Sequence, residues 1–151
     1  MKAVVFACGV MLRRVVAALL EKRSIDLIGA VDADPGLIGR DLGELLDPPG
    51  ELGIPVQPAA DAPLSAADFV VLTTGSYLEA IEDQLTTCID AGANVVSTCE
   101  ELAYPWLRNR SAAERIDLRA RERGVSVVGT GINQGFLMDT LPVVLTAPCL
   151  S

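Results

Sequence analysis

A turn near the N-terminus carries the first candidate chemistry. Residues 7–12 are Ala-Cys-Gly-Val-Met-Leu and stand where a dinucleotide-binding fold has Gly-x-Gly-x-x-Gly. In that motif the second glycine lets the backbone approach a pyrophosphate, and the N-terminus of the next helix offers free N–H groups and a partial positive charge. We therefore expect Gly9, Val10 and Met11 to contact the pyrophosphate of a dinucleotide.

Two of the three glycines of that motif are replaced. Ala7, at the first position, is a mild change if its φ angle stays negative. Leu12 occupies the third position, where glycine allows close packing of helix and strand, so its side chain should push the helix off the strand or force repacking. A Rossmann-like domain with a degenerate, empty turn explains the same residues, and this motif alone leaves both interpretations open.

An acidic residue follows at the distance that nucleotide binding requires. Asp32 ends the second predicted strand, where a carboxylate binds the hydroxyls of the adenosine ribose. Asp32 and Asp34 would repel a 2′-phosphate, so NAD is slightly favoured over NADP. Arg40 could oppose that preference if its loop folds back.

A small, hydroxyl-bearing turn follows the fourth predicted strand. It consists of Thr73, Thr74, Gly75 and Ser76 and lies at the carboxyl edge of the predicted sheet, where such folds bind ligands. We expect its backbone groups to approach the nicotinamide ribose. An ordinary turn at a strand end is the alternative.

Two adjacent acids end the fifth predicted strand on the same edge. Glu100 and Glu101 would attract a cationic substrate, and one of them could transfer a proton during catalysis if burial raised its pKa. Two acids at a helix N-terminus, favoured by the helix dipole alone, would give the same pattern.

An amide pair follows the sixth predicted strand. Asn133, beside Gln134, is placed to bracket the nicotinamide, although it could also cap the last helix. Cys8 and Cys99 flank the presumed site. The chain has no histidine to activate a thiol, so we interpret both cysteines as small packing residues.

Strands and helices alternate along the chain. Apolar, β-branched runs predict strands at 2–7, 25–32, 54–57, 68–75, 93–99 and 125–131. Helical spacing predicts helices at 11–22 and 78–91, a charged surface helix over 108–124, and a short helix or irregular turn at 37–47. A last helix should start within 136–145, where Pro142 should kink or end it. This order predicts an α/β fold, a Rossmann-like, doubly wound parallel sheet in the strand order 3-2-1-4-5-6.

Composition narrows the function classes. The net charge of −8 argues against nucleic acid or an anionic membrane surface as a partner. The absence of histidine removes the usual zinc sites and the Ser-His and Cys-His pairs, so no metal site is predicted. The four cysteines have no C-x-x-C spacing, and with no evident signal peptide we expect free thiols in a cytoplasmic protein.

Three segments resemble a known family. Residues 94–106 and 129–149, and the D-x-D-P…G-x-D-L-G pattern within 32–46, are similar to the 2,4-diaminopentanoate dehydrogenase group of the dihydrodipicolinate reductase-like superfamily. The resemblance implies an NAD(P)-dependent oxidoreductase that acts at an amine- or imine-bearing carbon. It implies a dinucleotide and a small cationic or amino-acid-like molecule as partners.

The same resemblance bears on domain organisation. Family members have an N-terminal Rossmann half followed by a substrate and oligomerisation domain, and they generally keep glycine at the positions of Ala7 and Leu12. We expect residues 1–151 to form the NAD(P)-binding domain of a homo-oligomer, without the C-terminal substrate domain. The alternative is a non-catalytic nucleotide-binding or oligomerising module with a decayed phosphate loop.

Overall fold

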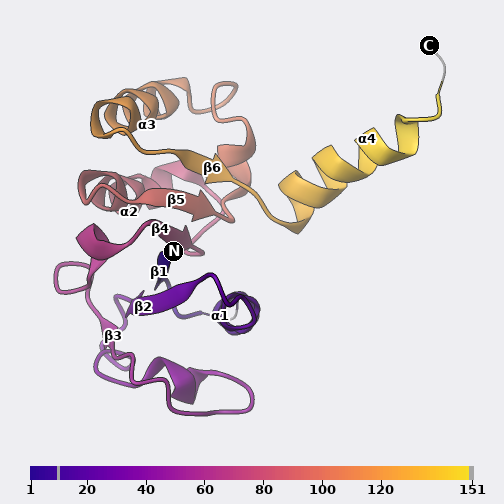
Figure 1. Cartoon of the computed structure of the whole chain (residues 1–151). Coiled ribbons are helices and arrows are strands. Elements are labelled where there is room, and N and C mark those ends of the chain that lie inside the picture. Colours follow the sequence, from indigo (N-terminus) through magenta and orange to yellow (C-terminus); the bar gives the residue numbers. More distant parts are fainter. Residues whose placement is uncertain (10, 150–151) are drawn as a thin grey trace.

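A parallel sheet forms the centre of the molecule. The computed structural model describes residues 1–9 and 11–149, and in them six parallel strands follow the order β3-β2-β1-β4-β5-β6 (Figure 1). The strands are β1 (Lys2–Phe6), β2 (Asp26–Val31), β3 (Val56–Gln57), β4 (Phe69–Leu72), β5 (Asn94–Ser97) and β6 (Val127–Gly129). The predicted doubly wound, Rossmann-like α/β fold is confirmed.

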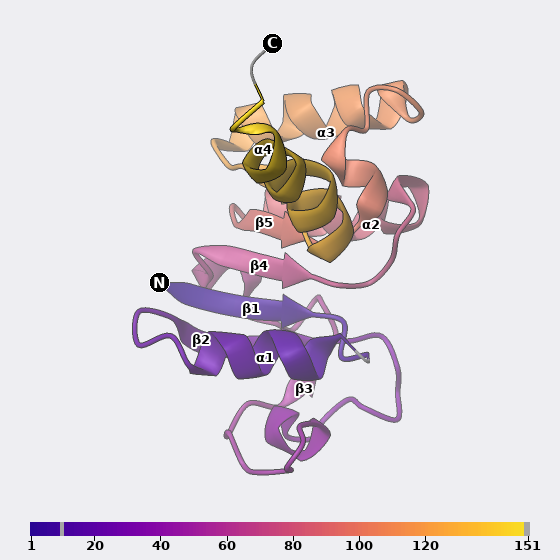
Figure 2. The ribbon, with the colours of Figure 1, turned by 90° about the vertical axis from the view of Figure 1, so that its right-hand side faces the viewer.

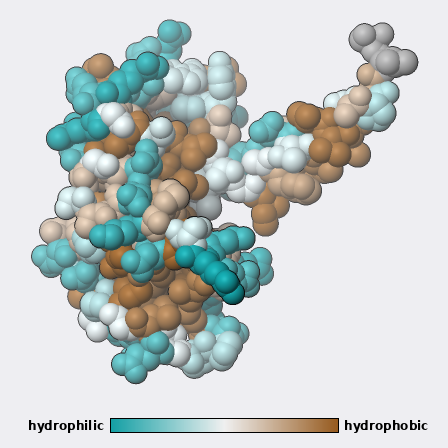
Figure 3. Space-filling view, in the orientation of Figure 1, coloured by the Kyte–Doolittle hydropathy of each residue, from teal (hydrophilic) through white to brown (hydrophobic). Residues whose placement is uncertain are grey.

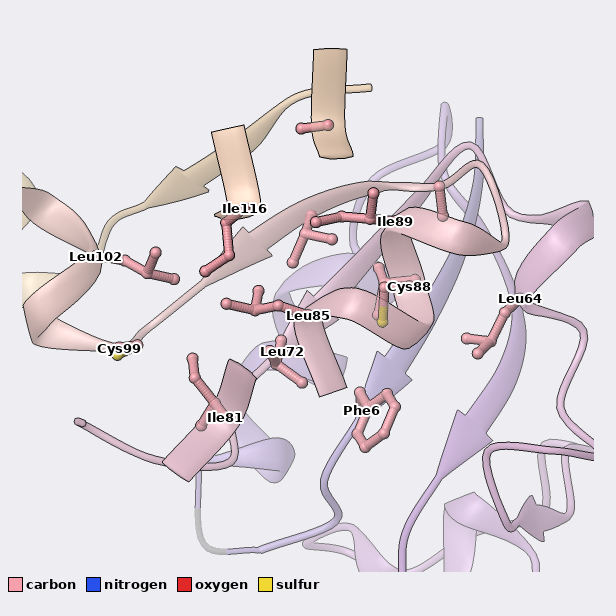
Figure 4. Close-up of a cluster of buried hydrophobic side chains, with 14 of the residues drawn as sticks. Phe6, Leu64, Leu72, Ile81, Leu85, Cys88, Ile89, Cys99, Leu102 and Ile116 are labelled. Atoms are coloured by element: carbon pink, nitrogen blue, oxygen red, sulfur yellow. The ribbon is translucent and has the colours of Figure 1, made fainter. Parts of the chain in front are cut away.

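Helices cover the two faces of this sheet unequally. Helix α1 (Leu12–Leu20) lies on one face, and α2 (Leu78–Asp90) and α3 (Arg110–Arg123) lie on the other (Figures 1 and 2). Strand residues alternate between the two layers: Val4 and Phe6 belong to the core under α2 and α3, whereas Val5 belongs to the core under α1. Figure 4 shows the first core, in which Phe6 and Leu72 of the sheet lie near α2 side chains.

The helix ends follow from local chemistry. Gly92 and Gly124, at φ of 81° and 68°, stop α2 and α3 as the sequence predicted, because glycine adopts this left-handed conformation without steric cost. Helix α3 is the expected charged surface helix. Its Arg115 forms an ion pair with Glu82 of α2 at 2.7 Å.

A carboxylate organises the loop between β2 and β3. The expected short element at 37–47 is a 3-10 turn, η1 (Leu42–Leu45). Asp41 precedes it and accepts hydrogen bonds from the backbone N–H groups of Gly43, Leu52 and Ile54, at 2.7, 2.9 and 3.0 Å. These bonds hold the Pro/Gly-rich residues 48–53, which precede β3, against the turn that begins at Asp41. Two further 3-10 turns, η2 (Leu64–Ala66) and η3 (Glu100–Ala103), were not predicted.

The last helical segment projects from the body (Figures 1 and 2). A π-helix, η4 (Ile132–Thr140), leads directly into α4 (Leu141–Thr146). Of the two outcomes expected at Pro142, a kink or an end of the helix, the second does not occur, because α4 continues to Thr146. Pro142 lies in the first turn of α4, where its missing N–H costs little. Several apolar side chains of the segment are exposed, Met138 at 76%, and brown surface marks the projecting arm in Figure 3.

The described part of the chain contains no helix with the length and apolarity that crossing a membrane requires.

Candidate functional site

The register of the sheet brings four loops to one edge. The paired residues that end β1, β4, β5 and β6 are Phe6, Leu72, Ser97 and Gly129. Beyond this row the chain leaves the sheet, and each following residue donates its N–H back to the neighbouring strand, as Thr73 does to the Phe6 carbonyl at 3.0 Å. The strands therefore end earlier than predicted, and the polar residues assigned to their ends lie in turns.

A cavity of about 580 Å³ lies at this edge. Its lining is Met11, Val15, Thr73, Thr74, Gly75, Ser76, Thr98, Glu100, Gly131, Ile132, Asn133 and Gln134. It thus brings together seven candidates from four separate stretches: Met11, Thr73, Thr74, Gly75, Ser76, Glu100 and Asn133. Gly9, Asp32 and Glu101 are not among its lining residues, and Val10 lies outside the described residues.

The cavity also has lining residues that the sequence analysis did not select. Thr98 and Gly131 follow β5 and β6, so the rule that selected Thr73 could have found them. Val15 lies one helical turn after Met11 and was assigned only to the apolar stripe of α1. The buried amide of Gln134 donates to the carbonyls of Thr98 (3.1 Å) and Thr130 (2.9 Å) and so joins the ends of β5 and β6.

The first turn adopts a strained backbone at Ala7. Its φ is +81°, so the condition under which alanine would be a mild replacement is not met. A non-glycine residue in this region costs about 1–3 kcal/mol unless its surroundings hold it. Here the Ala7 N–H donates to the Val31 carbonyl at 2.9 Å, and its carbonyl accepts from the Thr73 hydroxyl at 3.3 Å.

Asp32 closes this turn from the end of β2. Its Oδ2 accepts from the Cys8 N–H at 2.6 Å, and its Oδ1 accepts from the N–H groups of Ala33 (2.7 Å) and Asp34 (2.9 Å). Burial, and secondarily the negative charge of Asp32, raise the pKa of the Cys8 thiol to about 12. Burial also raises the pKa of Cys99. Both thiols are therefore protonated near neutral pH and buried, as expected of packing residues.

Leu12 packs into the core. Of the two expected outcomes, displacement of α1 or repacking around Leu12, the burial of this side chain fits repacking. Its side chain is 1% exposed and lies in the buried cluster that includes Val5 and Val16. The α1 side chains that face the cavity are Val15 and the preceding Met11, so Leu12 does not obstruct it.

Gly9 faces open space. A Cβ built on it would meet no atom of the described residues within 4 Å outside its two chain neighbours, and its φ is not in the left-handed region. Among the described residues, no side chain caps the N-terminus of α1 that follows. The fold itself gives no reason for glycine here, whereas a ligand that approaches the backbone would.

The two adjacent glutamates point to different places. Glu100 lines the cavity, and hydrogen bonding from the Ser76 hydroxyl, with smaller help from its own backbone and the Asn133 amide, holds its pKa below the usual range. The pKa of Glu100 is therefore shifted opposite to the rise that proton transfer would use, and a role of Glu100 in proton transfer stays a prediction. Asn133 lies inside η4 and not at its cap, which is Gly131. The cavity contains a carboxylate that stays ionised.

Glu101 turns away from the cavity. Its Oε2 accepts from the backbone N–H of Leu78 and from the side-chain amide of Asn109, both at 2.8 Å. Of the two acids that the sequence placed together, only Glu100 lines the cavity of about 580 Å³, while both line a second hollow beside Tyr104 and Arg108.

Comparison with characterised proteins gives similarity over nearly the whole chain. This chain is 32% identical to 2,4-diaminopentanoate dehydrogenase of Acetoanaerobium sticklandii over 150 residues. The aligned region covers 98% of this chain and 42% of that protein. It is 29% identical over 146 residues to 4-hydroxy-tetrahydrodipicolinate reductase of Methanothermobacter thermautotrophicus, covering 93% and 53%. The resemblance inferred from the sequence is confirmed. No family model matches the chain.

Solved structures agree with this resemblance. The amine dehydrogenase of Mycobacterium smegmatis is 31% identical, with a TM-score of 0.88 over 96% of this chain and 43% of that one. A 3-ketoreductase of Actinomadura kijaniata, solved with NADP, has a TM-score of 0.62 at 18% identity over 94% and 43%, and shows the shared fold alone. The chain spans about half or less of the length of the diaminopentanoate dehydrogenase, the reductase and the amine dehydrogenase that it resembles.

Proposed function

We propose that this chain binds a nicotinamide dinucleotide across the carboxyl edge of its sheet, as the cofactor-binding part of an oxidoreductase for small amino- or imino-acid substrates. The observation that carries the proposal is the cavity that brings Met11, Thr73–Ser76 and Asn133 together. It lies beside the switch point between β1 and β4, where the strand order reverses and doubly wound sheets bind ligands.

The layout of the edge suits an extended dinucleotide. Gly9 and Asp32 follow β1 and β2 and would take the pyrophosphate and the adenosine ribose, with the uncapped N-terminus of α1 offering N–H groups to the phosphates. The cavity over β4, β5 and β6 would take the nicotinamide ribose and ring. When bound, the cofactor supplies the hydride chemistry, and these residues hold and orient it.

The charge of the cavity favours an amine-bearing substrate. Glu100 is the one titratable side chain among the described lining residues, and its lowered pKa keeps it anionic. An ammonium group placed near it would be attracted, by an amount that water limits because Glu100 is exposed. The name of one relative, 2,4-diaminopentanoate dehydrogenase, denotes a substrate with two amino groups.

The acids after β2 favour NAD over NADP. Asp32 and Asp34 would face a 2′-phosphate with like charge. Arg40, which could have offset them, forms an ion pair with Glu44 at 3.1 Å. We therefore propose that the chain prefers NAD to NADP.

A second candidate is a nucleotide-binding module that does not catalyse. The positive φ of Ala7 and the pKa of Glu100, lowered rather than raised, favour it. Binding of an unrelated nucleotide such as ATP as tightly as NADH would support this candidate over the first.

Fluorescence titration with NADH and NADPH tests the proposal. We expect saturable binding of NADH, and a Kd about tenfold higher for NADPH, which corresponds to about 1.4 kcal/mol of charge repulsion. Gly9→Ala should weaken NADH binding. Gly50→Ala is the matched control, because a Cβ there also meets nothing within 4 Å and its φ is also outside the left-handed region. Equal effects of the two substitutions, or no saturation in the unmodified protein, would contradict the proposal.

A further inference from the structure

Glu101 makes a long-range cap on α2. Its Oε2 accepts the Leu78 N–H at 2.8 Å across 23 residues of sequence, while Tyr77 at the N-cap position provides no side-chain hydrogen bond. The same oxygen accepts from the Asn109 amide, also at 2.8 Å, just before α3 begins. One atom therefore joins the starts of two helices to the turn after β5. Its position at a helix N-terminus is favoured by the helix dipole.

Further bonds tie the same turn to the loop after β4. The Glu101 N–H and the Cys99 thiol both donate to the Ser76 carbonyl, at 3.3 and 3.2 Å. Ser76 is therefore held from its backbone side by the turn that carries both glutamates. Ser76 and Glu100 both line the cavity, and the Ser76 hydroxyl is the main cause that holds the pKa of Glu100 below its usual range.

We infer that Glu101 is a positioning residue: by joining the start of α2 to the turn after β5, it sets Ser76 against Glu100 in the cavity. A cap for α2 alone would need only a short polar side chain at position 77, which would hold the helix without linking the two loops. The consequence for cofactor binding rests on the function proposed above. The relation between Glu101, Ser76 and Glu100 can be measured in the free protein.

The test compares Glu101→Gln with Glu101→Ala. Both remove the charge of residue 101. Only glutamine keeps an oxygen that can accept from Leu78 and Asn109, as the single Oε2 does here. The readout is the pKa of Glu100, followed by NMR of its side-chain carboxyl in the free protein. The titratable groups around the two glutamates, Cys99, Tyr104 and Arg108, are the same in both variants.

We expect Glu101→Gln to leave the pKa of Glu100 below its usual range. Glu101→Ala should raise that pKa towards the usual range, because the side chain of residue 101 no longer ties the start of α2, two residues after Ser76, to the turn after β5. Loss of charge alone would lower the pKa of Glu100 in both variants, so the sign separates the two causes. If Glu101→Ala does not fold, Asn109→Ala removes one of the two bonds and should shift the pKa of Glu100 in the same direction. Equal pKa values of Glu100 in the glutamine and alanine variants would overturn the inference.

Binding of NADH to the same variants adds the functional consequence. Glu101→Ala should raise the Kd for NADH about tenfold, equivalent to about 1.4 kcal/mol, while Glu101→Gln keeps it near the unmodified value. If the unmodified protein does not bind NADH, the proposed function fails, and the titration of Glu100 still decides the positioning role. A pKa difference in Glu100 without a difference in Kd would overturn the link to binding.

Discussion

The carboxylate of Asp32 accepts a hydrogen bond from the backbone N–H of Cys8 at 2.6 Å, across 24 residues of the chain. This contact joins the end of β2 to the turn after β1. Asp32 is therefore part of the turn itself, besides being the group proposed to bind the adenosine ribose.

Replacing Asp32 with alanine should destabilise the protein. The change leaves the N–H groups of Cys8, Ala33 and Asp34 without their acceptor, and losing bonds to a charged group costs about 1–3 kcal/mol. Urea unfolding measures the loss. Asp34→Ala removes the same charge two residues away, where the side chain accepts one N–H, from Gly36, and should cost less. Equal losses would mean that the turn does not depend on Asp32.

Replacing Ala7 with glycine should stabilise the protein. Glycine adopts φ near +81° freely, so the substitution removes strain of about 1–3 kcal/mol and loses about 0.4–1 kcal/mol through the more flexible unfolded chain. The expected net gain is about 1 kcal/mol, seen as a higher Tm. Ala18→Gly, on the exposed side of α1, is the matched control and should instead destabilise by about 0.5–1 kcal/mol. A loss of stability at both sites would show that Ala7 is not strained.

Replacing Leu12 with alanine should cost stability without improving binding. The side chain is buried in the core under α1, so its truncation should cost about 2–5 kcal/mol. Leu20→Ala, at the half-exposed end of the same helix, should cost much less. The Kd for NADH should not fall, because Leu12 lies outside the cavity lining. Tighter binding of NADH by Leu12→Ala would contradict this account and show that the Leu12 side chain obstructs the dinucleotide site.

Acid should destabilise the protein partly through Asp41. Hydrogen bonds from backbone N–H groups, that of Leu52 first, hold the pKa of this carboxyl below its usual range. Because the pKa is lower in the folded state, the stabilisation is complete above the unfolded pKa of about 3.9 and is lost as the pH falls through the folded value.

The free energy of unfolding of Asp41→Asn should therefore change less between neutral and acidic pH than that of the unmodified protein. It should still change, because ion pairing with Arg115 and Arg119 also lowers the pKa values of Glu82 and Asp90. Urea titrations across the acid range measure the difference. The same pH dependence in both proteins would exclude Asp41 as a contributor.

The sequence predicted the sheet well because the signal is local. Apolar runs bounded by glycine and proline mark buried parallel strands, and Gly92 and Gly124 end helices by their own backbone preference. The direction in which a side chain points is not determined by its sequence neighbours alone. Adjacent Glu100 and Glu101 diverge because Glu101 is drawn to Leu78 and Asn109, partners that no spacing rule identifies.

The backbone conformation of the turn after β1 could not be predicted from the sequence either. The φ of Ala7 depends on hydrogen bonds to Val31 and Thr73, which are close only in the folded sheet. Leu12 could be buried because the space under α1 accepts it, which is a property of the whole layer.

Mapping NADH onto the isotope-labelled protein by NMR tests the central claim most directly. Amide shifts that saturate with NADH should occur at Gly9, at residues 73–76 and at Asn133, and should be smaller with NADPH. The amide shifts of α3, which lies on the face of the sheet opposite to α1, should stay unchanged. Saturating shifts confined to α3, or no shifts at all, would contradict a dinucleotide site at the carboxyl edge.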